Sequence, residues 1–353
     1  MNKKPGIKPL TVGIAGTAKN TGKTTTLSAI MDEVKKQSGL TLGLTSIGYD
    51  GEGFDNVTGL PKPRIEVWPG NIVAIAEKCN KFSSAAMETI KQTDISTPLG
   101  KVVINRVVSR GKVVLAGANN RRELRTVLDL LCELVNIIIV DGALNRIAPM
   151  AEADCLIFVT GAARHPDIPR LTLESRCMVD LLSTPALEEL GIVETAGSIF
   201  NRAGFEALAE KFSAADTVRI HGIMGEQFLK ELIDLSSHRA SNRLANKRLI
   251  FDDPIKLLLA GDAVAVSRIL QQIAAGSITI GVAKATKLLA VTVNPYYPQY
   301  RYNMADYVAA YVDAANLLES VGGNIEIPCY DVVRQGGQDI FQKIMDYRTF
   351  SHR

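Results

Sequence analysis

The sequence predicts an α/β protein built on a doubly wound, mostly parallel sheet. Roughly the first 200 residues alternate short β-branched runs with stretches of helical periodicity. Two continuous apolar runs, at residues 137–140 and 155–159, are typical of strands that are covered on both faces. Strand, helix and strand in repetition indicate a parallel sheet with helices on both sides.

The composition is that of an ordinary globular protein. A chain of 353 residues with 46% hydrophobic residues is long enough for a large core and for two domains. The 40 Lys and Arg residues nearly balance the 37 Asp and Glu residues, so charge gives no indication of a nucleic-acid or membrane partner. No apolar run approaches the ~20 residues of a membrane span, and the N-terminus does not resemble a secretory signal. We therefore expect a cytoplasmic protein whose five scattered cysteines are free thiols.

The expected elements follow in order from the N-terminus. A strand at residues 11–17 leads into a helix that places Leu27, Ile30 and Val34 on one face and ends at Gly39. A second strand covers residues 41–48, and a Gly- and Pro-rich loop covers residues 50–69. Two strands around the SRG turn are expected within residues 101–117.

The later elements continue the same alternation. A helix capped by Asn119 or Asn120 precedes the two apolar strands, and a further helix spans residues 168–182. A strand at residues 195–202 completes the nucleotide-binding domain that we predict for residues 1–205. Residues 206–353 are expected to form a smaller C-terminal α/β domain, with a helix at residues 304–320.

The stretch GIAGTAKNTGKTTT lies between the first strand and the first helix. The phosphate-binding pattern GxxxxGK[ST] fits at Gly22, Lys23 and Thr24. Thr17 stands at the position of its first glycine, and Gly16 lies one residue earlier. The preceding strand and following helix are the context that such a loop requires, although a Gly/Thr turn could also arise by chance.

The residue types have a chemical reason. Consecutive backbone N–H groups at a helix N-terminus surround a phosphate, and glycine lets the backbone approach closely. Lys23 is expected to reach the β- and γ-phosphate oxygens of a nucleotide, and the Thr24 hydroxyl is expected to bind Mg²⁺. The expected contacts of the loop with the nucleotide are Gly16, Thr17, Lys19, Asn20, Thr21, Gly22, Lys23, Thr24 and Thr25.

A carboxylate for the metal is supplied by the run NIIIVDG. Asp141 ends this strand, where it is expected to bind Mg²⁺ through a water, while Gly142 offers its N–H to the γ-phosphate. An apolar run that ends in Asp-Gly is also common in ordinary turns. The prediction of a metal-binding role for Asp141 therefore depends on the presence of the phosphate-binding loop in the same chain.

The loop GTAKNTGKT resembles that of dethiobiotin synthetase and its relatives, within a P-loop NTPase class that includes MinD-type ATPases and signal-recognition GTPases. AGSIFNR resembles the strand of that class that ends in Asn-Arg, and in ATP-binding members this Asn contacts adenine. The resemblance, which covers residues 10–205, implies that role for Asn201; the alternative is a loop cap. ANKRL and ATKLL lack the Asp of guanine-reading motifs, which favours ATP.

Four further residues carry weaker expectations. Asp50 follows the second strand, where members of the class place an acidic residue near the metal, so we expect it in the catalytic and metal site beside Lys23 and Asp141; a solvated acidic turn is the alternative. Lys19 is one residue displaced from the MinD-type lysine that crosses a dimer interface, so we expect it to contact phosphates in its own subunit. His165 could face the nucleotide or cap a helix, and His221 is expected to be structural.

Over nearly the whole chain, the strings SIGYDGE, VDGALNR and VTVNPYYP resemble the reactivating subunit of adenosylcobalamin-dependent lysine or ornithine aminomutases. This resemblance implies an ATP-driven chaperone that acts with a protein partner. A ligase or kinase of the dethiobiotin synthetase type, acting on a small carboxylate, and a nucleotide-binding regulator without turnover are the rival interpretations. Whether the chain forms a homodimer is left open.

Overall fold

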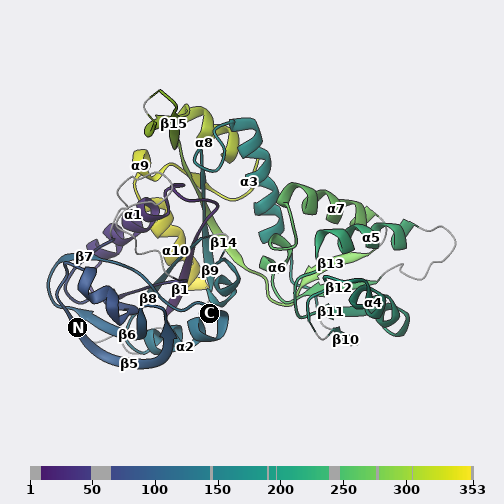
Figure 1. Cartoon of the computed structure of the whole chain (residues 1–353), viewed down its shortest axis with the longest axis horizontal. Coiled ribbons are helices and arrows are strands. Elements are labelled where there is room, and N and C mark those ends of the chain that lie inside the picture. Colours follow the sequence, from purple (N-terminus) through teal and green to yellow (C-terminus); the bar gives the residue numbers. More distant parts are fainter. Residues whose placement is uncertain are drawn as a thin grey trace. The chain divides into compact units, whose positions relative to one another are not determined.

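The chain forms two compact units, one made of residues 1–171 and 288–353 and the other of residues 172–287 (Figure 1). The computed structural model describes residues 9–48, 65–143, 146–188, 191–195, 197–237, 247–275, 278–303 and 305–350. The predicted division at residue 205 is therefore wrong. The smaller α/β unit is inserted into the larger one, because the chain returns to the first sheet after residue 287.

The larger unit contains a nine-stranded sheet. From one edge to the other its strands are β17 (Cys329–Tyr330), β14 (Lys287–Asn294), β9 (Cys155–Gly161), β1 (Leu10–Gly16), β8 (Ile137–Ala143), β2 (Leu42–Ser46), β4 (Ile72–Ala76), β6 (Gly100–Val107) and β5 (Met87–Thr97). The pairs from β9 through β1, β8 and β2 to β4 are parallel, whereas β4, β6 and β5 pair antiparallel. The predicted α/β class with a mostly parallel sheet is thus confirmed.

Helices cover both faces of this sheet. Alternate residues of β1 and β8 join one apolar cluster with α1 (Lys23–Lys36) and α10 (Gln338–Phe350), to which Val12, Ile14, Ile137, Ile139, Leu27, Ile30, Ile340 and Ile344 belong. The intervening Ile138 and Val140 are also fully buried, and α2 (Arg121–Cys132) contacts β8 and β4. Burial on both faces explains why β8 reads as a continuous apolar run.

Smaller elements complete the larger unit. They are two antiparallel strand pairs, β3 (Ile65–Val67) with β7 (Gly111–Val113) and β15 (Tyr296–Arg301) with β16 (Asp306–Tyr311). The unit also contains the 3₁₀ turns η1 (Glu77–Phe82) and η3 (Ala148–Glu152) and the helices α8 (Ala314–Gly322) and α9 (Val332–Gln335). Asn120 caps α2, since its side chain accepts a hydrogen bond from Glu123 N at 2.9 Å.

The second unit is a four-stranded parallel sheet with its own helices. The strand order is β10 (Ile192–Thr195), β11 (Thr217–Ile220), β12 (Arg248–Phe251) and β13 (Thr279–Val282). Its helices are α4 (Arg202–Ala214), α5 (Glu226–Ser237), α6 (Ile255–Leu258) and α7 (Ala263–Ala275), while α3 (Ile168–Leu182) runs from the first unit into the second. The bounds of α3 match the prediction.

Several local predictions differ from the structure. The strand expected at residues 195–202 is not found in the part that the structure describes: β10 ends at Thr195, and within residues 197–202 Ile199 makes an isolated bridge with Met224. The second strand expected within residues 101–117, β7, pairs with β3 rather than with β6. The helix expected at residues 304–320 begins only at Ala314, where Asp313 caps it, because residues 306–311 pair as β16.

Candidate functional site

The turn between β1 and α1 is held by the strand beside it. Thr17 N donates to Val159 O at 2.9 Å, and the Thr17 hydroxyl lies 3.2 Å from that of Thr160. The backbone then turns through left-handed conformations at Asn20 (φ 63°) and Gly22 (φ 100°). Such angles are readily available to glycine and, less readily, to asparagine, which explains these two residue types.

The turn presents a series of backbone donors. Within the part of the chain that the structure describes, the N–H groups from Ala18 to Thr25 donate no hydrogen bond, and Thr26 N is the first to do so, to Gly22 O at 2.9 Å. Consecutive free amides at the start of a 14-residue helix, together with the helix dipole, are the kind of geometry that attracts anions. The turn thus presents several unpaired backbone donors on one stretch of chain.

Lys23 begins α1 and extends across the turn. A Cβ atom on Gly16 would lie 2.4 Å from Lys23 Cγ, so only glycine lets the lysine stem pack against the end of β1. The Lys23 ammonium lies 3.6 Å from Asp141 Oδ1, and each side chain is 12% exposed. A cation and an anion thus lie together beside the turn, with water excluded from most of their surface.

The sheet register explains why Asp141 reaches this place. In the parallel pairing Asp141 lies opposite Ile14 of β1 and Ser46 of β2, at the carboxyl ends of both strands. Its carbonyl accepts a hydrogen bond from Ile47 N at 2.8 Å. Gly142 packs closely, since a Cβ there would lie 2.5 Å from Met150 Cε. Ligands of open α/β sheets bind at this edge.

The remaining predicted loop residues lie around the same turn. Thr24 is half-buried on the first turn of α1, Lys19 and Thr25 are exposed, and the Thr21 hydroxyl donates to Ala18 O at 2.9 Å. These side chains thus lie next to the free amides; their contact with a nucleotide stays a prediction. Asp50 lies outside the described residues.

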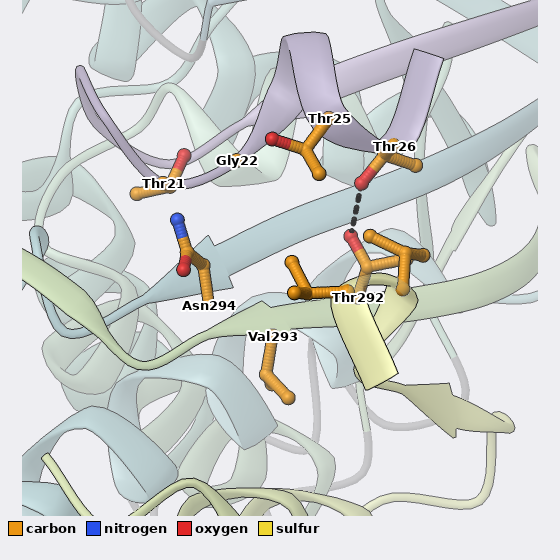
Figure 2. Close-up of a pocket in the computed structure, with 9 residues that line it drawn as sticks. Thr21, Gly22, Thr25, Thr26, Thr292, Val293 and Asn294 are labelled. Atoms are coloured by element: carbon orange, nitrogen blue, oxygen red, sulfur yellow. Dashed lines mark hydrogen bonds between the residues drawn. The ribbon is translucent and has the colours of Figure 1, made fainter. Parts of the chain in front are cut away.

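A pocket opens next to the loop on the side of β14 (Figure 2). It is lined by Thr21, Gly22, Thr25, Thr26, Thr292, Val293, Asn294, Val332 and Val333. Asn294 ends β14, and its side-chain Nδ2 donates to Asn20 O at 3.3 Å. Sequence reasoning missed Asn294; the signal that could have found it is the apolar run that ends in VNP.

Asn201, the predicted adenine contact, lies in the other unit. Its side chain caps α4 by accepting a hydrogen bond from Gly204 N at 2.8 Å, which is the alternative interpretation. The motif on which the resemblance depended also lacks its expected strand. His165 likewise accepts a hydrogen bond, from Asp167 N at 3.1 Å, in the turn before α3.

His221 has partners that the sequence did not reveal. At the carboxyl end of the second sheet its Nδ1 lies 3.0 Å from Asp252 Oδ1 and its Nε2 lies 3.2 Å from Glu194 Oε2. Asp252 Oδ1 also accepts from Arg219 Nη2 at 2.8 Å. This ion network links β10, β11 and the residue that follows β12.

No family model matches the chain, and searches of curated proteins and of solved structures found no match either. Within the described ranges, no three or more His, Cys, Asp or Glu side chains are grouped as a metal-binding cluster. No helix in the described parts of the chain has the length and apolar character needed to cross a bilayer.

Proposed function

We propose that the larger unit is a P-loop nucleotide-binding domain that binds Mg-ATP and hydrolyses it. The observation that carries this proposal is the run of free amides from Ala18 to Thr25, with the Lys23–Asp141 pair beside it. A polyphosphate would accept hydrogen bonds from these amides, and the Lys23 ammonium would neutralise its terminal charge.

The side chains around the turn also suit Mg²⁺. This ion takes oxygen ligands, keeps several waters and is held chiefly by the phosphates and by one or two protein groups. The Thr24 hydroxyl and the Asp141 carboxylate are the groups proposed to hold it, with Asp50 as a further candidate. When bound, Mg²⁺ would neutralise charge that develops on the phosphates. The absence of a larger carboxylate cluster therefore does not weigh against this site.

The proposed contact with the base lies at the end of β14, beside the loop. The side-chain amide of Asn294 lies next to Asn20 of the loop and carries both a donor and an acceptor. Since Asn294 belongs to the same unit as the loop, we prefer it to Asn201 as the residue that contacts the base. The sequence lacks the Asp of a guanine-reading motif, which favours ATP.

ATP turnover would drive a conformational or chaperone task on a protein partner. The whole-chain resemblance names an adenosylcobalamin-dependent aminomutase as that partner. A direct test measures phosphate release by the purified chain alone, with a panel of small carboxylic acids, and with such an aminomutase. Faster phosphate release with the aminomutase supports the ATP-driven chaperone, and faster release with one acid supports the ligase or kinase. Tight ATP binding without phosphate release in every mixture supports the regulator.

The ATP-driven chaperone, the ligase or kinase and the regulator all require Lys23 for nucleotide binding. The Lys23→Ala variant therefore tests the assignment of the site itself. If the Lys23→Ala variant binds Mg-ATP as the wild type does, the loop is not the nucleotide site and the proposal fails.

A further inference from the structure

One contact between the first helix and β14 joins two of the residues that line the pocket. The hydroxyl oxygens of Thr26 and Thr292 lie 2.9 Å apart, and both side chains are 1% exposed. Figure 2 shows the two hydroxyls facing each other between the first turn of α1 and β14. β14 is not the neighbour of β1, because β9 lies between them. The bond therefore joins the start of α1 to a strand two places away.

Packing by itself does not require this pair. Valine has nearly the volume of threonine, so valines at the two positions would fill nearly the same space without polar atoms. They could not, however, approach as closely, since carbon atoms meet at about 3.5–4.0 Å, longer than the observed contact. The hydroxyl pair therefore sets a short, directional spacing between α1 and β14.

This spacing acts on the groups that face the anion site. Thr26 N donates the first hydrogen bond of α1, to Gly22 O, so the position of Thr26 determines the orientation of the turn that carries the free amides of Thr24 and Thr25. A second bond from the same strand, Asn294 Nδ2 to Asn20 O, holds the apex of the loop. β14 thus contacts the loop and the first helical turn at separate points.

We infer that Thr26 and Thr292 are positioning residues for the phosphate-binding loop: their bond fixes α1 against β14 so that the loop amides point toward one phosphate position. This inference rests on the proposed function. It also gives β14 a role in positioning the loop. This strand begins at Lys287, the residue at which the inserted unit ends.

The test uses the full-length chain with Thr26→Val, Thr292→Val, the double variant and Thr292→Ser. Thr93→Val is the matched control, because the Thr93 hydroxyl also makes a buried hydrogen bond, to Val102 O at 2.8 Å, on the distant edge strand β5. For each variant, urea unfolding gives the stability, and titration with fluorescent N-methylanthraniloyl-ATP and Mg²⁺ gives the Kd.

Each single valine variant leaves one buried hydroxyl unsatisfied and should weaken both stability and binding. The double variant should recover most of the stability, yet its Kd should stay about tenfold above that of the wild type, because a shift of about 1 Å misaligns the amides. Thr292→Ser keeps the hydroxyl, so its Kd should lie within about twofold of the wild type.

The comparison with Thr93→Val decides the inference. A double variant whose Kd rises no more than that of the control at equal stability would show that the pair is only structural and would overturn the inference. A wild type that binds no nucleotide, or a Lys23→Ala variant that binds it normally, would instead overturn the proposed function and the inference with it.

Discussion

The ammonium group of Lys23 lies 3.6 Å from the Asp141 carboxylate, although the two residues come from distant segments of the chain. Their meeting follows from the adjacency of β1 and β8, which brings the start of α1 beside the carboxyl end of β8. A nucleotide with its metal would compete with this ion pair, since phosphates attract the ammonium and Mg²⁺ attracts the carboxylate. The pair is therefore the natural starting point for mutagenesis.

Replacing Lys23 by alanine should raise the Kd for Mg-ATP by at least about 100-fold, because charge-assisted hydrogen bonds to the phosphates are lost. Isothermal titration calorimetry measures this change. Lys36→Ala is the matched control, since Lys36 lies at the other end of the same helix and pairs with Glu33. An equal effect of both variants would argue against a specific role for Lys23.

Asp141→Asn preserves size while it removes the charge. If Asp141 helps to hold Mg²⁺, hydrolysis should fall by at least about 100-fold, whereas binding of ATP without the metal should change by less than about threefold. A phosphate-release assay and a binding titration in EDTA separate the two effects. Asp129→Asn, on the exposed face of α2, should change neither. Undiminished hydrolysis by Asp141→Asn would exclude the proposed role.

Gly22→Ala should damage the site in two ways. The left-handed φ of 100° strains any residue with a Cβ, and that atom would lie 3.2 Å from the Asn294 side chain. Gly70 provides the control, because its φ is also left-handed but a Cβ there would meet nothing within 4 Å. Both variants should lose about 1–2 kcal/mol of unfolding free energy in urea, but only Gly22→Ala should also lose Mg-ATP binding.

Asn294 and Asn201 make contrasting predictions. Asn294→Ala removes the amide beside the loop and should weaken Mg-ATP binding by about five- to tenfold, as expected for one or two hydrogen bonds. Asn201→Ala removes the cap of α4 and should destabilise the smaller unit by about 1 kcal/mol without changing the Kd. The reverse pattern in a titration with labelled ATP would restore Asn201 as the base contact.

The buried thiols predict an alkaline dependence of stability. Burial raises the pKa of Cys79 from 9.0 to about 11, so between these values the thiol stays protonated in the folded state and ionises in the unfolded state. The contribution of this thiol to the free energy of unfolding is fully present below pH 9. It decreases as the pH rises from 9 to about 11, by at most about 1.4 kcal/mol per pH unit.

Cys79→Ala should remove that part of the slope when urea unfolding is compared at pH 8.5 and pH 10.5. Burial likewise raises the pKa of Cys329, to about 12, so this thiol should add to the decline in both proteins. Identical slopes for Cys79→Ala and the wild type would contradict the shift.

Sequence periodicity predicted the helices and strands whose pattern of burial is regular along their length. The spacing of Leu27, Ile30 and Val34 predicts α1 because one face of that helix is buried, and the apolar run before Asp141 predicts β8 because both faces of that strand are covered. β5 was missed because its outward residues are polar at an edge of the sheet, so its sequence lacks an apolar run. The tyrosine-rich β15 and β16 form a ladder in which none of the described residues is buried, and this leaves no core-facing pattern to detect.

The sequence by itself determined the loop, its residue types and the strand–helix context, because these depend on neighbours within a few positions. Only the tertiary structure decided that β14 returns to the first sheet after an inserted unit, that Asn294 lies beside the loop, and that Thr26 meets Thr292. These facts depend on the order in which distant strands assemble, and periodicity along the chain carries no record of that order.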